Sequence, residues 1–131
     1  MPEINWIGGA VAGIAGFVLG GVWYSALFGN VWMREHNITK EGPFRYPVWL
    51  PMLAAVGSSI VGAFVLSWLL GPAPGVQAGV TLGAVIGFLV VAGSIKMNGL
   101  FAQDSMALIT VETMYPALQY TMMGLILGLW P

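Results

Sequence analysis

The sequence predicts an all-α integral membrane protein, a bundle of four transmembrane helices that pack along glycine-rich seams. Of its residues, 58% are hydrophobic and only 7% are charged. A soluble domain carries about 25% charged residues. Long apolar runs recur along the chain, and about 20 apolar residues are enough to cross a hydrocarbon core of ~30 Å. We therefore expect a single transmembrane domain over residues 1–131, with helices at about 4–28, 48–70, 76–95 and 106–130.

The first predicted helix, at about 4–28, separates small side chains from bulky ones. On a helical wheel its glycines share one side, and β-branched residues occupy the opposite side. Glycine is common in membrane helices, but this segregation argues against chance enrichment. Because helices in lipid associate by close packing over small residues, we expect a packing seam at Gly9, Gly13, Gly16 and Gly20. The seam has more small positions than one partner helix requires, which predicts a homo-oligomer, either a dimer or a trimer.

An aromatic segment ends the first helix and leads into a predicted interfacial loop at about 29–47. Tryptophan and tyrosine gather at membrane–water boundaries, where Lys and Arg side chains reach the lipid phosphates. We interpret these aromatic residues as boundary residues rather than as a pigment or nucleotide site. The predicted interfacial anchor consists of Trp23, Tyr24, Trp32 and Arg34.

Turn residues and capping residues predict where the third and fourth helices begin and end. The segment Gly-Pro-Ala-Pro-Gly at 71–75 predicts a tight hairpin between the second and third helices. The third helix is expected to end at Lys96, whose positive charge suits a helix C-terminus. The connection before the fourth helix contains Asp104-Ser105, a suitable N-cap, with Asp104 as the expected capping residue. A second packing seam is predicted in the third helix at Gly79, Gly83 and Gly87.

Two segments resemble a known family. The run LGGVWYSALFGNVW at 19–32, preceded by Asn5-Trp6, is similar to the domain-of-unknown-function family numbered 1761. The closing run MMGLILGLW at 122–130 resembles the last helix of the same family. The family consists of small, mainly bacterial, multi-span membrane proteins. The resemblance implies a fold and a membrane location, and it implies no activity.

Polar residues of the fourth helix form the candidate functional site. Glu112 lies about two turns into the helix, where an ionisable group is costly and usually faces a partner or water. Tyr115 and Gln119 share its side of the helical wheel, and Pro116 cannot donate a hydrogen bond to the Glu112 carbonyl. The alternative is that Glu112 only joins helices, by pairing with Lys96 or bonding to Tyr24 or Asn5. The candidate polar intramembrane site comprises Glu112, Tyr115, Gln119, Lys96 and Asn5.

Several function classes are disfavoured by what the chain contains. It has no cysteine and one histidine, His36, so we expect no metal and no cofactor. The net charge of −1 disfavours nucleic acid as a partner. No phosphate loop or catalytic triad can be assembled, so we expect no enzyme.

Three functional hypotheses remain. The first is a structural or accessory membrane subunit that self-associates or joins a larger membrane complex. The second is a small channel or transporter with a polar path at Glu112, Tyr115 and Gln119. The third is a protein that binds a lipid, quinone or pigment.

The expected location is the cell (inner) membrane, with the lipid bilayer as the immediate partner. All four Lys and Arg residues lie in the predicted loops after helices one and three. The positive-inside rule then predicts that both loops are cytoplasmic and that both termini are outside.

Overall fold

The computed structural model describes residues 4–35, 46–47 and 49–130. Within these ranges all regular structure is helical, which confirms the predicted all-α class. Two segments, η1 and η2, are π-helical, with hydrogen bonds that reach back five residues instead of four. The elements in chain order are α1 (Trp6–Val22), η1 (Trp23–Leu27), α2 (Gly29–Glu35), α3 (Trp49–Leu70), α4 (Val76–Ala84), η2 (Val85–Val91), α5 (Ala92–Phe101) and α6 (Met106–Leu129).

Three continuous helical stretches of the described chain are long and apolar enough to cross a membrane, which indicates a membrane protein. They are Trp6–Leu27, Trp49–Leu70 and Val76–Phe101, with mean hydropathies from 1.7 to 2.1. The helix α6 has 24 residues, but it does not qualify as an apolar span. Its interior carries polar residues such as Glu112 and Gln119, which lower its hydropathy. The predicted count of four spans is therefore not confirmed by hydropathy.

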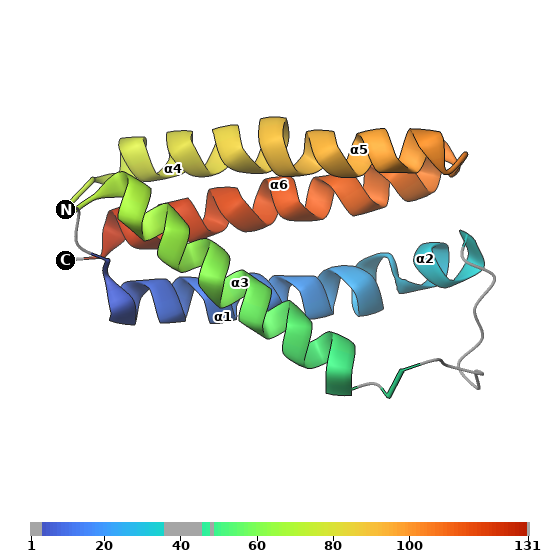
Figure 1. Cartoon of the computed structure of the whole chain (residues 1–131), viewed down its shortest axis with the longest axis horizontal. Coiled ribbons are helices and arrows are strands. Elements are labelled where there is room, and N and C mark those ends of the chain that lie inside the picture. Colours follow the sequence, from blue (N-terminus) through green and yellow to red (C-terminus); the bar gives the residue numbers. More distant parts are fainter. Residues whose placement is uncertain (1–3, 36–45, 48, 131) are drawn as a thin grey trace.

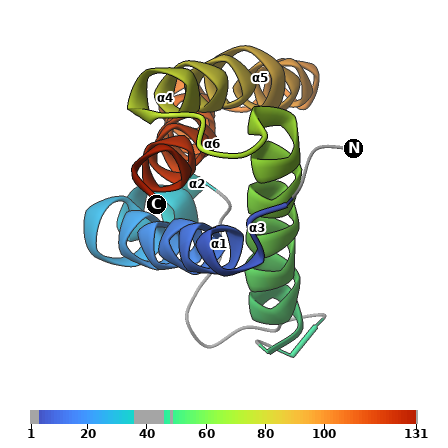
Figure 2. The same ribbon diagram turned by 90° about the vertical axis from the view of Figure 1, so that its left-hand side faces the viewer.

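Of the four long helical stretches, α6 is the central one, and the other three pack around it. In Figure 1 the continuous helix α4–η2–α5 runs along one side of α6, and α1 runs along the other. The helix α3 crosses them obliquely (Figure 1) and lies to one side of them (Figure 2). A central position explains the composition of α6, because its polar side chains can contact neighbouring helices instead of lipid. On α1, by contrast, the β-branched side is exposed, as Val11, Ile14 and Val18 show.

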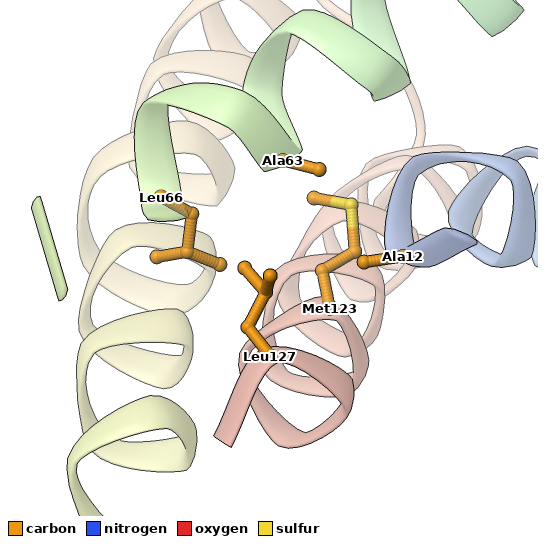
Figure 3. Packing of buried hydrophobic residues seen from close by; sticks show 5 residues of the cluster. All are labelled: Ala12, Ala63, Leu66, Met123 and Leu127. Carbon is orange, nitrogen blue, oxygen red and sulfur yellow. The ribbon is translucent and has the colours of Figure 1, made fainter. Parts of the chain in front are cut away.

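The hydrophobic core joins α1, α3 and α6 near the end of the bundle that carries both termini. Its members are Ala12, Ala63, Leu66, Met123 and Leu127 (Figure 3). Leu66 and Met123 are the largest side chains that are fully buried. The two alanines allow α1 and α3 to approach α6 closely enough for these larger side chains to fill the space between them.

Glycines set the closest approaches between helices. A Cβ atom added to Gly83 would lie 2.2 Å from the backbone oxygen of Tyr120, a distance that real atoms do not reach. Gly79 and Gly87 likewise face α6 backbone atoms, at Gly124 and Pro116. Because backbone cannot rotate away as a side chain can, any larger residue at these positions would force α4 and η2 away from α6.

The glycines of the first helix are also used within the chain. Gly9 and Gly13 face α3, Gly16 faces α3 and α6, and Gly20 faces α6. The predicted homo-oligomer was inferred from small positions in excess of one intramolecular partner. Two partner helices account for all four glycines, so the seam no longer supports that inference.

Two predicted boundaries need correction. The third helix continues to Phe101 instead of ending at about 95, because Gly99 is buried against Ile109 and does not break the helix. Lys96 therefore lies inside the helix rather than at its C-terminus. Within the predicted interfacial loop, Gly29–Glu35 form the helix α2, and residues 36–45 lie outside the described residues.

Candidate functional site

A partly open cleft lies beneath the first half of α3 and has two adjoining parts, which share three lining residues. The first, here called the aromatic chamber, has a volume of about 440 Å³ and is lined mainly by Phe17, Gly20, Gly21, Trp32, Pro51 and Met52. The second, the polar chamber, has a volume of about 430 Å³ and includes Ser58, Ser59, Glu112, Gln119 and Tyr120. Tyr24, Ala55 and Tyr115 line both chambers.

The cleft exists because α3 packs along only half of its length. Its residues 49–55 are all exposed, whereas Ser59, Ala63 and Ser67 further along are buried. Figure 1 shows the first half of α3 diverging from α6. Small residues repeat every four positions on this side of α3, so the helix lies close to α1 where it packs and leaves a hollow where it diverges.

A hydrogen-bond network fixes the floor of the polar chamber. The Gln119 amide donates to Ser59 Oγ at 3.0 Å, and Ser59 Oγ donates to the Gly13 carbonyl at 2.6 Å. The Tyr115 hydroxyl donates to the Gly16 carbonyl at 2.9 Å. In the described part of the chain, no buried side-chain N or O atom is without a hydrogen-bond partner. The chamber wall is thus held in place by bonds from α6 to α1 and α3.

The structure brings together three of the five residues predicted for the polar site. Glu112, Tyr115 and Gln119 line the polar chamber. Lys96 instead lines a separate hollow on the outside of α5 and α6, because the helical turn places it on a different face from Ile95, which faces the chamber.

Asn5, the fifth predicted residue, lies far from the chamber at the start of α1. Its side chain accepts a hydrogen bond from the Gly8 backbone N–H at 2.9 Å, as an N-cap does. Its own backbone N–H donates to Ser67 Oγ at 2.8 Å, which ties α1 to α3. Asn5 and Lys96 therefore do not belong to the site that contains Glu112.

The predicted interfacial anchor separates into residues with different roles. Trp23 is only 8% exposed, and its indole N–H donates to the Val111 carbonyl at 2.9 Å. It joins η1 to α6 and does not lie at the protein surface, contrary to the prediction. Tyr24 forms part of the cleft wall, with edge-to-face contacts to Tyr115 and Trp32 at centroid distances of 5.5 and 6.4 Å. Arg34 is exposed in the last turn of α2.

Several cleft residues were missed by the sequence analysis. Ser59 carried a usable signal, since it belongs to the four-residue repeat of small residues in α3. Tyr120 and Ser58 carried no such signal. They line the chamber because α3 crosses α6, and this crossing cannot be predicted from the pattern of either helix. The π-helical segments η1 and η2 also border the cleft, through Tyr24 and Val91. Such segments are frequent at functional sites, and no sequence pattern predicts them here.

Comparison with known proteins identifies the family. The family described as protein of unknown function (DUF1761) matches residues 7–128, and the chain belongs to it. The resemblance found in the sequence is thereby confirmed. No curated protein and no solved structure matches the chain significantly.

Proposed function

We propose that this member of the DUF1761 family is a non-enzymatic, four-span membrane protein that binds an amphiphilic molecule of the bilayer in the cleft beneath α3. The observation that carries this proposal is the junction of the two chambers. An aromatic hollow and a polar hollow of similar volume meet at Tyr24, Ala55 and Tyr115. Ligand sites in proteins are typically concave and apolar with a few convergent polar groups. A molecule with an apolar tail and a hydrogen-bonding head group matches this arrangement.

The position of the two chain ends supports α6 as the fourth span. Ile4 and Trp130 line the same hollow, so both ends of the described chain lie at one end of the bundle. An even number of crossings brings a chain back to its starting side, whereas three crossings would not. The 24 residues of α6 span about 36 Å at 1.5 Å per residue, which is long enough for the hydrocarbon core.

The binding hypothesis is better supported than the hypothesis of a channel or transporter. A path across the membrane has to continue from the polar chamber to the end of the bundle that carries the termini. In the described chain that route is occupied by the core residues Ala63, Leu66, Met123 and Leu127. Because these apolar side chains block the route, a cleft that opens at the side of the bundle is favoured, rather than a pore that passes through one chain.

The hypothesis of a self-associating accessory subunit has less support than the binding hypothesis. The glycine seams that suggested it face partner helices of the same chain. A homo-oligomer and a larger membrane complex stay predictions that need their own measurement. The inner membrane and the outward position of both termini also stay predictions.

Gentle extraction followed by native mass spectrometry tests the proposal. We expect a molecule bound at fixed stoichiometry, which solvent extraction and an absorption spectrum then assign to lipid, quinone or pigment. The same spectrum reports self-association as peaks at multiples of 13.9 kDa.

A pair of variants ties the bound molecule to the cleft. Ala55→Trp fills the junction of the chambers, whereas Ala54→Trp adds the same side chain next to it, at an exposed position outside both chambers. We expect Ala55→Trp to lose most of the bound molecule and Ala54→Trp to retain it. An empty wild-type protein, or equal retention by both variants, would contradict the proposal.

A further inference from the structure

We propose that a groove on the outside of the bundle, here called the outer hollow, binds an anionic phospholipid whose phosphate pairs with Lys96. The outer hollow lies between η2–α5 and α6 and has a volume of about 380 Å³. Its lining includes Phe88, Leu89, Gly93, Lys96 and Met114. This site is separate from the cleft beneath α3 and does not depend on the function proposed for that cleft.

Lys96 supplies the positive charge of the outer hollow. No carboxylate is among the described residues that line it, and Lys96 forms no ion pair in the described part of the chain. Of the four Lys and Arg residues of the protein, Lys96 is the one that lies within an apolar stretch long enough to cross a membrane. A basic side chain in such a stretch is costly unless it finds a partner or reaches the head groups. The partner of Lys96 therefore has to come from outside the chain.

The position of Lys96 along its helix places this partner at the head-group level. The stretch Val76–Phe101 has 26 residues and is about 39 Å long, which exceeds a hydrocarbon core of about 30 Å. Lys96 lies about 7.5 Å from the end of this stretch. The flexible stem of a lysine lets its ammonium group extend to the boundary, where lipid phosphates lie.

The apolar part of the outer hollow favours a lipid over a soluble phosphate. The side chains of Phe88, Leu89 and Met114 are exposed beside Lys96. Between them, Ala117 is buried, and Gly93 has no atom within 4 Å of its Cβ position. These small residues leave the groove open, so an acyl chain can lie against the apolar side chains while its phosphate meets the ammonium group.

The charge of the site favours an anionic lipid over a zwitterionic one. A zwitterionic head group carries its own cation, which competes with Lys96 for the phosphate. In Figure 1, α5 runs towards the end of the bundle away from the two chain ends, which is the end predicted to be cytoplasmic. Basic pockets between transmembrane helices on that side of a membrane bind anionic head groups.

A lipid titration followed by native mass spectrometry tests the inference. The full chain in a neutral detergent is titrated with phosphatidylglycerol and, separately, with phosphatidylcholine that has the same acyl chains. We expect phosphatidylglycerol to bind roughly fivefold more tightly, which corresponds to one lysine near an anionic lipid. Water-soluble glycerol phosphate at the same concentration should not displace it, because it has no acyl chain for the groove.

Three charge variants assign the preference to Lys96. We expect Lys96→Gln to abolish the preference for phosphatidylglycerol and Lys96→Arg to retain it. Arg34→Gln is the matched control, since it removes the same charge from α2, outside the outer hollow, and should leave the preference unchanged. Circular dichroism establishes that each variant is folded.

A pair of glycine variants assigns the acyl chain to the groove. Gly93 and Gly57 are both exposed helical glycines with no atom within 4 Å of the Cβ position, but Gly57 lies on α3, outside the outer hollow. We expect Gly93→Trp to weaken the binding of phosphatidylglycerol at least fivefold and Gly57→Trp to leave it unchanged.

Four outcomes would overturn the inference. They are equal binding of the two lipids by the wild-type protein, a preference that survives Lys96→Gln, equal binding by the two glycine variants, and displacement by glycerol phosphate. The variant Ala55→Trp separates the outer hollow from the cleft, because it fills the cleft and should leave the preference unchanged. If Ala55→Trp removes the preference, the lipid lies in the cleft and its assignment to the outer hollow is wrong.

Discussion

At the scale of single residues, close backbone contacts give the clearest prediction. Gly83→Ala puts a methyl group 2.2 Å from the backbone oxygen of Tyr120, whereas Gly93 has no atom within 4 Å of its Cβ position. We expect Gly83→Ala to lower the free energy of unfolding by about 1–3 kcal/mol, the usual cost of overpacking. Gly93→Ala should be neutral or slightly stabilising, because alanine is the better helix former.

Unfolding in detergent, followed by helical circular dichroism, measures both glycine variants. Equal stability of the two would mean that α4 and η2 do not pack against α6 as closely as the structure indicates. The two substitutions add the same methyl group to two helical glycines, so the comparison isolates the packing environment.

Residue-level prediction from the sequence succeeds within one helix and fails between helices. The spacing of Glu112, Tyr115 and Gln119 placed them on one face of a helix, and they line one chamber. Asn5 and Lys96 were added as polar residues that could reach that face. Which residue faces which depends on how α5 and α1 are placed around α6, and helical periodicity does not contain that information.

At the scale of elements, α3 is divided into a packed half and an unpacked half. Leu66 is fully buried, whereas Leu53 is 60% exposed on the same helix. Leu66→Ala leaves a cavity at a fully buried position, which costs roughly 2–5 kcal/mol for buried leucines. Because helices in lipid associate without a hydrophobic driving force, we expect a value near the lower end of this range. Leu53→Ala should change stability by less than about 0.5 kcal/mol.

Detergent titration of both leucine variants, with α-helical signal as the readout, tests the division of α3. A loss of stability in Leu53→Ala as large as that in Leu66→Ala would show that the first half of α3 is also packed, and the cleft would then not exist as described.

Element prediction works where apolar length and turn residues agree. The second predicted helix, at about 48–70, corresponds to α3, and the third began where predicted, after the Gly-Pro hairpin. It ended later than predicted because Gly99 is buried in a contact and does not break the helix. The sequence alone does not distinguish a glycine that breaks a helix from one that permits a close approach between helices. The end of the third helix was therefore not predictable.

At the scale of the whole molecule, the arrangement of the chain ends predicts a topology. The hairpin after α3 and the turn after α5 lie at opposite ends of the bundle (Figure 1). The chain has no native cysteine, so a single introduced thiol is a unique label. We expect Pro72→Cys to react with an impermeant reagent from outside the cell and Ala102→Cys to react only after permeabilisation. Both positions are exposed.

If both thiols are labelled from the same side, the helical stretch between them, Val76–Phe101, does not cross the membrane. That result would contradict four crossings. The reverse labelling pattern would keep the crossing of Val76–Phe101 and reverse the orientation inferred from the positive loops. The polar composition of α6 keeps this fourth long helix from qualifying as an apolar span, since a helix surrounded by other helices does not need an apolar surface.

The π-helical segment η2 makes the length of the third span as important as its composition. The Ala92 N–H donates to the Gly87 carbonyl five residues back, so one extra residue is accommodated within the turn. A helix advances about 100° per residue. Deleting one residue between Val85 and Val91 would restore ordinary helical geometry and leave Ile95 in the cleft wall. Deleting one residue within α4 would instead turn the rest of the span by that angle relative to the start of α4. The segment η2 is therefore the part of this span where a change of length by one residue is compatible with the cleft.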